Sequence, residues 1–272
     1  MNIRGQMRRV LQGLALSLLL PFAASAATNY NFGNLTGANF DFIDLNETVQ
    51  TADDESAPLF EAPGVLGGSG GSDVLVFTPS SFLADSAGGE GQVPPDGNPF
   101  DNTHSTFNAT IMGNAPGAFV DNIILTENGD GSITSFGGIG GVTAQLSGTI
   151  TILDTVSGAN EGSSFNFGVS GDNWVTSYTG GSVIGDQLTI STPGAISWSA
   201  VVDIDLASVF GANDITKVEL QWNNILSAFS QATSDALIQK KTGETTLQVI
   251  PEPTTGLLLL GGLIGLAARR RS

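Results

Sequence analysis

Strict alternation of apolar and polar side chains is the feature of this sequence that most limits its fold. In residues 142–153, apolar residues and one glycine occupy every second position, and threonine, glutamine and serine lie between most of them. Residues 196–206 alternate in the same way, with Trp198 on the apolar side. A period of two places one set of side chains in a core and the other in water, as in an antiparallel sheet with one solvated face. The chain is therefore predicted to consist of β-strands.

Further strands and turns follow from the same pattern. A third long strand is predicted to begin with Val218, Leu220 and Trp222. Shorter strands are predicted at residues 40–45, 74–77, 107–112, 119–125, 164–169 and 188–191. Residues 128–131, Asn-Gly-Asp-Gly, predict a hairpin turn, and Thr242-Gly243 predicts the turn of a closing hairpin made of residues 236–240 and 245–249.

These elements predict an all-β fold. About ten or more antiparallel strands in one chain favour a two-sheet sandwich that is jelly-roll-like. A β-solenoid is the alternative, but the sequence has no fixed repeat. One helical turn is predicted after Asp205, and residues 231–238 are ambiguous. Residues 84–105 are rich in glycine, proline and asparagine and are predicted to form a long loop.

The first 26 residues have the composition of a secretory signal peptide. Arg4, Arg8 and Arg9 form a positive region, residues 10–20 are mostly apolar, and Ala24-Ser25-Ala26 is a small-residue cleavage site. Cleavage is expected between Ala26 and Ala27, which implies export through the secretion translocon.

The end of the chain has three consecutive parts. Pro251-Glu252-Pro253 comes first, an uncharged apolar run covers residues 256–268, and Arg269, Arg270 and Arg271 follow. Because proline resists a helix or a central strand, the tripeptide is expected to stay extended and accessible to an enzyme. The apolar run is shorter than the roughly 20 residues of a stable span, which favours a temporary anchor over a permanent one. The arginines are expected to act as a stop-transfer signal on the cytoplasmic side.

In this order the three parts resemble the PEP-CTERM sorting signal of exported bacterial proteins. The resemblance implies that an exosortase, a membrane-embedded processing enzyme, recognises Pro251, Glu252 and Pro253. It also implies an inner-membrane-anchored precursor whose mature form reaches the cell surface or the extracellular polysaccharide matrix. The predicted organisation is a signal peptide at residues 1–26, an acidic β-sandwich body at 27–248, and a sorting segment with an apolar transmembrane helix at 249–272.

Without the two terminal segments the chain is strongly acidic. Residues 27–250 contain 25 of the 26 acidic residues but only Lys217, Lys240 and Lys241 of the nine basic ones, so their net charge is −22. Such a charge argues against nucleic acid and anionic membranes as partners. The chain has no cysteine, which removes disulfides and thiol nucleophiles, and its single histidine excludes zinc sites built on several imidazoles.

Candidates for catalysis are few. His104 lies near Asp101 and Ser105, but no nucleophile elbow accompanies them, and a loop position predicts an exposed imidazole. Asp203 and Asp205 share one strand face at a separation of about 6.5 to 7 Å. That separation suits a glycoside hydrolase, yet it is more typical of a solvated face. We therefore predict that the protein is not an enzyme, with a secreted hydrolase as a minor alternative.

No residue set is predicted to bind a metal. Calcium suits the acidic clusters at residues 53–55 and 84–105, because it prefers carboxylate and carbonyl oxygens. Residues 126–137 only partly resemble an EF-hand loop, since Thr126 and Gly137 stand where acidic residues are required.

The predicted role is that of an exported surface or matrix protein, structural or adhesive, associated with exopolysaccharide. The alternative is a lectin-like carbohydrate-binding module, whose sugar binding either requires calcium or does not. Trp174 and Tyr178 are the candidates to contact a sugar ring, because turn residues flank them, whereas Trp198 and Trp222 are assigned to the core.

Overall fold

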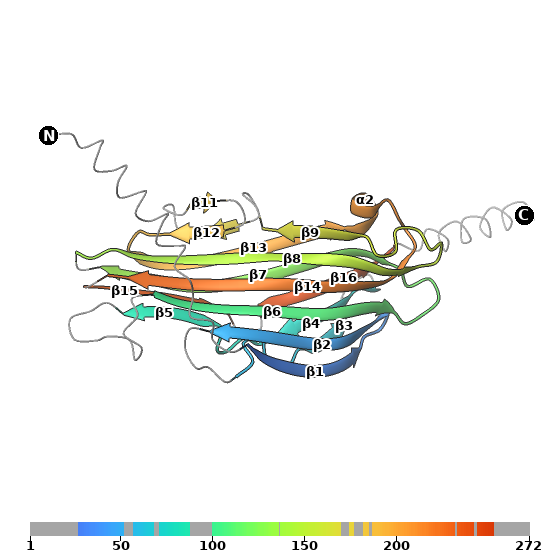
Figure 1. The fold of residues 1–272 in the computed structure, drawn as a ribbon, viewed down its shortest axis with the longest axis horizontal. Helices are drawn as coiled ribbons and strands as arrows, with labels where there is room; N and C mark the ends of the chain where they lie inside the picture. Colours follow the sequence, from blue (N-terminus) through green and yellow to red (C-terminus); the bar gives the residue numbers. More distant parts are fainter. Residues whose placement is uncertain are drawn as a thin grey trace, which may run out of the picture.

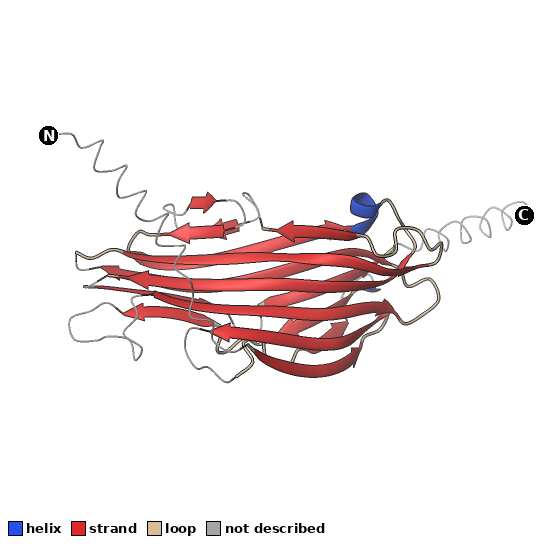
Figure 2. Cartoon of the chain, in the orientation of Figure 1, coloured by secondary structure: helices blue, strands red, loops and turns tan. Residues whose placement is uncertain are grey.

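The body of the protein is nearly all β-strand in a computed structural model of the chain (Figure 2). The structure describes residues 27–51, 57–67, 71–87, 100–135, 137–169, 174–176, 182–184, 187–231, 233–241 and 244–252. The strands are β1 (Thr28–Thr36), β2 (Phe40–Thr51), β3 (Gly64–Gly67), β4 (Asp73–Phe77), β5 (Leu83–Ala87), β6 (Phe100–Gly113), β7 (Val120–Ser135), β8 (Gly140–Thr155), β9 (Ser164–Gly168), β10 (Trp174–Thr176), β11 (Ser182–Ile184), β12 (Gln187–Ile190), β13 (Gly194–Asp205), β14 (Ile215–Ser230), β15 (Ser234–Lys240) and β16 (Thr245–Pro251).

The strands form two antiparallel sheets. Sheet A has the order β1-β2-β6-β14-β8-β12-β11, and β9 also pairs with β8. Sheet B has the order β10-β13-β7-β16-β4-β3, with β15 also paired with β7, and β5 paired with β15. In Figure 1 the long strands β8, β14, β6 and β2 of sheet A run along the long axis of the molecule, over β13, β7 and β16. The predicted antiparallel two-sheet sandwich of the jelly-roll-like class is confirmed.

Long strands at the centre of each sheet carry the alternation seen in the sequence. β14 pairs with β6 on one side and with β8 on the other along most of its length. Its inner side chains include Trp222, which lies opposite Phe107 of β6 and Gly148 of β8. A Cβ on Gly148 would lie 2.4 Å from the Phe167 ring, so glycine is needed there for close packing.

The core between the sheets is aromatic at its centre. Phe60, Phe77, Phe107 and Trp222 are fully buried and contact one another. The ring centroids of Phe77 and Phe107 are 5.0 Å apart and those of Phe60 and Trp222 are 5.3 Å apart, both in edge-to-face geometry. Trp198 is buried as well, so the assignment of Trp198 and Trp222 to the core is confirmed.

The predicted hairpin turn at residues 128–131 is wrong. These residues lie inside β7, which continues from Val120 to Ser135. Gly129 faces inward, where a Cβ would lie 2.2 Å from the Trp198 ring and 2.3 Å from the carbonyl oxygen of Gln239. The glycine therefore makes room for a tryptophan on the neighbouring strand. In the sequence alone, a glycine required for such packing cannot be distinguished from a glycine of a turn.

The predicted closing hairpin is wrong too. β15 and β16 both pair antiparallel with β7, one after the other along the same side, at residues 129–135 and 120–126 of β7. No pairing joins β15 to β16 in the part of the chain that the structure describes. Two collinear strands with a short polar interruption have the same composition as a hairpin, and the predicted turn residues 242–243 lie outside the described residues.

The predicted loop at residues 84–105 is strand at both of its ends. β5 continues to Ala87 and β6 begins at Phe100, while residues 88–99 lie outside the described residues. His104 is therefore not on an exposed loop but on β6, opposite Gln50 of β2 and Ile225 of β14. Burial there lowers the pKa of His104. The alternation of apolar and polar residues does not reveal this part of β6, because its inner positions are polar: Asp101, Thr103 and Ser105.

The helical turn predicted after Asp205 is confirmed as α2 (Leu206–Phe210). The carboxylate of Asp205 accepts hydrogen bonds from the N–H of Ser208 at 2.8 Å and from its hydroxyl at 2.7 Å. The ambiguous segment 231–238 is strand from Ser234 onward. The signal peptide and the residues from 253 onward lie outside the described residues, and none of the described helices is long and apolar enough to span a membrane.

Candidate functional site

The sorting tripeptide begins where the last strand ends. β16 runs between β4 and β7, but its pairing with β4 stops at Val249, and Pro251 pairs only with Val120 of β7. The expectation that the prolines keep this segment out of a central strand is therefore wrong for Pro251, which is the last residue of β16. A proline is tolerated there because the strand end needs no further ladder bond. The strand also continues past residue 248, where the body was predicted to end.

Glu252 lies against the sandwich beside other acidic side chains. Its backbone N–H donates to the carbonyl oxygen of Phe119 at 3.3 Å. Burial raises the pKa of Glu252, and the charges of Asp121 and Asp214 raise it further. Burial and the charge of Asp205 raise the pKa of Asp121 in the same way. The chain therefore leaves the body through an acidic, partly desolvated surface, and Pro253 and Arg269 to Arg271 lie outside the described residues.

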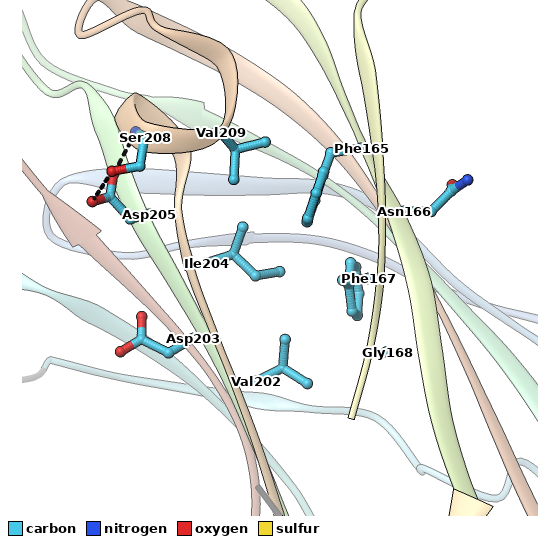
Figure 3. A pocket seen from close by; sticks show the side chains of 10 residues that line it. All are labelled: Phe165, Asn166, Phe167, Gly168, Val202, Asp203, Ile204, Asp205, Ser208 and Val209. Carbon is cyan, nitrogen blue, oxygen red and sulfur yellow. Dashed lines mark hydrogen bonds between the residues drawn. The ribbon is translucent and has the colours of Figure 1, made fainter. Parts of the chain in front are cut away.

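A cleft of about 490 Å³, lined by both apolar and polar residues, lies between the edges of the two sheets (Figure 3). β9 of sheet A contributes Phe165 and Phe167, and β13 contributes Val202 and Ile204, with Val209 of α2 at one end. Figure 3 shows these apolar side chains turned toward one another across the cleft. Phe165 is 37% exposed, so an aromatic face borders the opening.

The two aspartates considered for glycoside hydrolysis are among the residues that line this cleft, but their side chains point away from its aromatic wall. Asp203 and Asp205 are outer residues of β13, and Figure 3 shows both side chains on the side away from Phe165 and Phe167. Asp205 already caps α2, and its hydrogen bonds with Ser208 lower its pKa. The pair therefore has the geometry of a solvated strand face.

The other candidates from the sequence are only partly placed. Trp174 begins β10, opposite Ala200 of β13, and Tyr178 lies outside the described residues. The acidic residues 53–55 also lie outside them, as do Glu90 and Asp96, two of the four acidic residues of 84–105. Within the described part of the chain, no group of three or more His, Asp or Glu side chains is arranged to hold a metal ion.

A row of uncharged polar side chains crosses the outer face of sheet A. Asn46, Asn108, Gln221, Thr149 and Asn166 stand opposite one another on β2, β6, β14, β8 and β9, and are called the polar row below. The amide of Asn108 donates to Asn46 at 2.9 Å, that of Gln221 to Asn108 at 3.0 Å, and the hydroxyl of Thr149 to Asn166 at 2.8 Å. Four strand spacings give the row a length of about 19 Å.

A second row beside it is also uncharged. Thr48, Thr106, Asn223 and Ser147 stand opposite one another on the same four central strands. The hydroxyl of Thr106 donates to Asn223 at 2.7 Å, and that of Thr48 donates to Asn29 of β1 at 2.7 Å. Many donors and acceptors are thus held in a flat array by the sheet and by one another.

Charge stands beside these rows on sheet A, at Lys217 and Glu219 of β14, and is spread over several strands on the outer face of sheet B. Aspartates occupy outer positions of β5, β7, β13 and β15, at Asp85, Asp130, Asp203, Asp205 and Asp235. Sequence reasoning separated polar from apolar faces but did not notice that two adjacent rows across sheet A lack charge. The signal was present in the outer residues of β8, predicted as Thr, Gln, Ser, Thr and Thr, but the partners of that strand were unknown.

Sequence reasoning also missed a group of charged residues inside the sandwich, around Lys240. The alternation of residues 236–240 assigns Lys240 to the inner face, and that observation was available from the sequence. Its partners come from strands far apart in the chain, and only the fold brings them together.

Comparison with known families identifies the end of the chain. Residues 249–271 match the family of the PEP-CTERM protein-sorting motif. The chain carries a PEP-CTERM protein-sorting motif. The match confirms the resemblance seen in the sequence, and the motif implies an exported protein that an exosortase processes from a membrane-anchored precursor.

The body has weaker likenesses. No curated protein matches the chain. Among solved structures, the chain is similar to TmCBM61 in complex with beta-1,4-galactotriose, at 11% identity over 69% of this chain and 88% of that one, with a TM-score of 0.17. It is also similar to a family 29 carbohydrate-binding module, at 9% identity over 79% of this chain and 90% of that one, with a TM-score of 0.14. A loop-swap mutant of Necallimastix patriciarum Xyn11A is similar at 10% identity over 78% of this chain and 96% of that one, with a TM-score of 0.18. TM-scores this low specify neither the topology nor a ligand.

Proposed function

We propose that this protein is sorted through Pro251, Glu252 and Pro253 to the cell surface or the extracellular matrix, where its body has a structural or adhesive role. The motif at residues 249–271 supports sorting to the surface, and the signal peptide features at residues 1–26 support export. Arg269, Arg270 and Arg271 hold the precursor at the inner membrane, and the exosortase reads the tripeptide. The end of β16 at Pro251 supports this, because the tripeptide begins at the last residue of that strand.

The sorting proposal is tested with the full chain in a host that has an exosortase. Wild type, Glu252→Ala and Glu244→Ala are compared by cell fractionation and intact mass. Glu244 is an exposed glutamate before β16 and serves as the matched control. Wild type and Glu244→Ala are expected to lose the arginines and leave the inner membrane, while Glu252→Ala keeps both the arginines and its membrane location. A wild-type protein that keeps its tail would refute the proposal.

The matrix partner that suits the body is a neutral polysaccharide bound along the polar row. The observation that supports this is the pair of adjacent uncharged rows on the outer face of sheet A, on a body with a net charge of −22. A neutral glycan offers hydroxyl groups, which the carboxamides and hydroxyls of the row match as donors and acceptors. The body is proposed to be non-catalytic, since this face holds its glycan without a carboxylate pair.

Matrix association is tested on the extracellular fraction of the same host. The mature protein is expected to stay with the polysaccharide in high salt, because hydrogen bonds between uncharged groups are not screened as ion pairs are. Digestion of the polysaccharide with glycoside hydrolases is expected to release it. Release by salt alone would mean that the acidic surface, and not the polar row, holds the protein in the matrix.

A lectin-like role is the second candidate, and the cleft beside Phe165 favours it. An exposed aromatic ring over a concave surface that also carries polar groups is a suitable platform for the face of one sugar ring. Phe165→Ala would then abolish binding to short oligosaccharides, while Asn108→Ala would leave it intact. The opposite result would assign binding to the polar row.

A further inference from the structure

Five polar side chains meet in the middle of the sandwich, away from both proposed surfaces. They are Glu47 of β2, Ser105 of β6, Glu127 of β7, Asn224 of β14 and Lys240 of β15, called the lysine cluster below, and each is at most 4% exposed. Nζ of Lys240 lies 2.6 Å from Oε2 of Glu127 and donates to Oδ1 of Asn224, also at 2.6 Å. The amine of Lys240 therefore contacts a carboxyl group and a carboxamide at the same time.

The surroundings of Lys240 are dry and apolar. Its Nζ lies 4.6 Å from the ring centroids of both Phe60 and Phe82. Burial lowers the pKa of Lys240 to about 8, even though the charges of Glu127 and Glu47 act in the opposite direction. A desolvated lysine beside a carboxylate can pass its proton along the short hydrogen bond, which leaves a neutral amine with a free lone pair.

The contacts of the cluster are incomplete at two atoms. Within the described residues, Oε1 of Glu127 and Nδ2 of Asn224 are buried without a hydrogen-bond partner. By contrast, Glu47 accepts from the hydroxyl of Ser105 at 2.6 Å and from the N–H groups of Leu59 and Phe60 at 3.1 Å each. A buried polar network with unpaired members is costly, so these two atoms need an explanation beyond stability.

We propose that Lys240 and Asn224 join in an intramolecular isopeptide bond, formed with the loss of ammonia. A C=O bond is about 1.2 Å long, so Cγ of Asn224 lies no farther than about 3.8 Å from Nζ of Lys240. This approaches the separation of about 3 to 3.5 Å at which two reacting atoms are ready to bond. The amine, the amide carbon and a proton carrier are thus assembled by the fold itself.

The step needs no other reactant. The salt-bridge proton moves from Nζ of Lys240 to Glu127, and the freed lone pair attacks Cγ of Asn224 while the carboxyl proton goes to Oδ1. The carboxylate of Glu127 then takes a proton from the attacking nitrogen and delivers it to Nδ2. The carbonyl reforms as the bond from Cγ to Nδ2 breaks, and Oδ1 returns its proton through Glu127 to the leaving nitrogen, which departs as an ammonium ion. The product is a secondary amide, with Glu127 unchanged.

The bond would tie the two sheets together. Asn224 is on β14 of sheet A and Lys240 is on β15 of sheet B, so the amide crosses the core. It would convert a buried amine into a neutral amide and remove the unpaired Nδ2 as ammonia. A chain without cysteine would gain a covalent link between its layers, which suits a protein placed outside the cell.

The test is a mass analysis of the full chain, expressed with its own signals and digested after purification. Trypsin is expected to leave Lys240 uncut, because an acylated lysine is not a substrate. The peptide from Val218 to Lys241 should then be lighter than its sequence by one ammonia. Chymotrypsin cleaves after Phe229, between the two joined residues, and the two fragments should stay together as one branched peptide.

Each other outcome overturns the proposal. A tryptic peptide that ends at Lys240 with unchanged mass means that no bond forms. A loss of ammonia whose two chymotryptic fragments separate means a cyclic imide at Asn224. A loss of water in place of ammonia means that a glutamate is the acyl partner.

Variants assign the roles and keep the test independent of folding defects in any one of them. Lys240→Met should abolish the loss of ammonia, and Glu127→Gln should abolish or greatly slow it while the chain remains able to fold. Lys241→Met is the matched control, because Lys241 is the neighbouring lysine on the outer face, 3.2 Å from Asp130, and it should react as wild type does. A Glu127→Gln chain that forms the bond at the wild-type rate would remove Glu127 from the proposed step.

Discussion

Lys240 and Lys241 are neighbours in the chain, and each pairs with a carboxylate, but the first pair is buried and the second is exposed to solvent. Lys240 points into the sandwich and lies 2.6 Å from Glu127 with both side chains buried. Lys241 points out of the same sheet and lies 3.2 Å from Asp130, with side chains 35% and 39% exposed. One step along a strand therefore moves an ion pair from a core into water.

The difference shows how this sandwich divides its polar groups. Inside, each polar group must find a partner because water is absent, so the lysine cluster governs stability and chemistry. Outside, polar groups exchange their bonds with water at little cost, so the polar row and the acidic face govern which partner is bound. The predictions below test this division.

The largest effect is expected from Glu127→Ala. It removes the carboxylate that contacts Nζ of Lys240 and leaves a buried amine without its acid, so the free energy of unfolding should fall by about 3 to 5 kcal/mol. Asp130→Ala breaks the outer pair and should cost about 0 to 1 kcal/mol. Urea unfolding of the two variants measures both values, and equal losses would contradict the division.

Gly129→Ala should have the next largest effect. Its Cβ would lie 2.2 Å from the Trp198 ring and 2.3 Å from a backbone oxygen, so β7 or Trp198 must shift. Overpacking of this kind costs about 1 to 3 kcal/mol. Gly64→Ala is the control, because no atom lies within 4 Å of the point where its new Cβ would stand, and thermal unfolding should show a change close to zero for it.

Acidification should stabilise the protein by a smaller amount. Burial raises the pKa of Glu47 above its usual 4.5, with its hydrogen bonds acting against that rise. The folded state then binds more protons than the unfolded state between these two pKa values, so the free energy of unfolding rises as the pH falls through this window. Urea midpoints at about pH 5 and about pH 7 measure it. Glu47→Gln should reduce the difference, and an undiminished difference would assign it to the net negative charge instead.

The smallest effect on stability is expected on the polar row. Asn108→Ala removes two hydrogen bonds at the surface, from Gln221 and to Asn46, whose polar groups regain water. The free energy of unfolding should change by about 1 kcal/mol or less. A loss as large as that of Glu127→Ala would show that the row supports the fold and is not free to serve binding.

Much of the fold could be predicted from the sequence, because alternation is a local property. The strands around residues 142–153 and 196–206, the cap at Asp205 and the two core tryptophans all depend on neighbours in the chain. The wrong turns have one physical cause. Gly129 and the interruption after Lys240 are set by contacts with other strands, and the sequence shows glycine and polarity without showing what they face.

The sites were predictable only where the chain itself carries the signal. The sorting motif is contiguous and was recognised without a structure. The polar row draws one residue from each of five strands, and the lysine cluster does the same, so register and sheet order had to be known first. The cleft beside Phe165 also needs both sheets, since Phe165 and Ile204 meet only across the edge of the sandwich.

The central claim is that the outer face of sheet A binds neutral polysaccharide. The most direct measurement is affinity electrophoresis of the folded protein through gels that contain neutral polysaccharide from the host matrix. We predict that Asn108→Ala combined with Gln221→Ala loses the retardation seen for wild type, whereas Asp130→Ala combined with Asp203→Ala, on the outer face of sheet B, keeps it. Full retardation of the sheet A variant would contradict the claim.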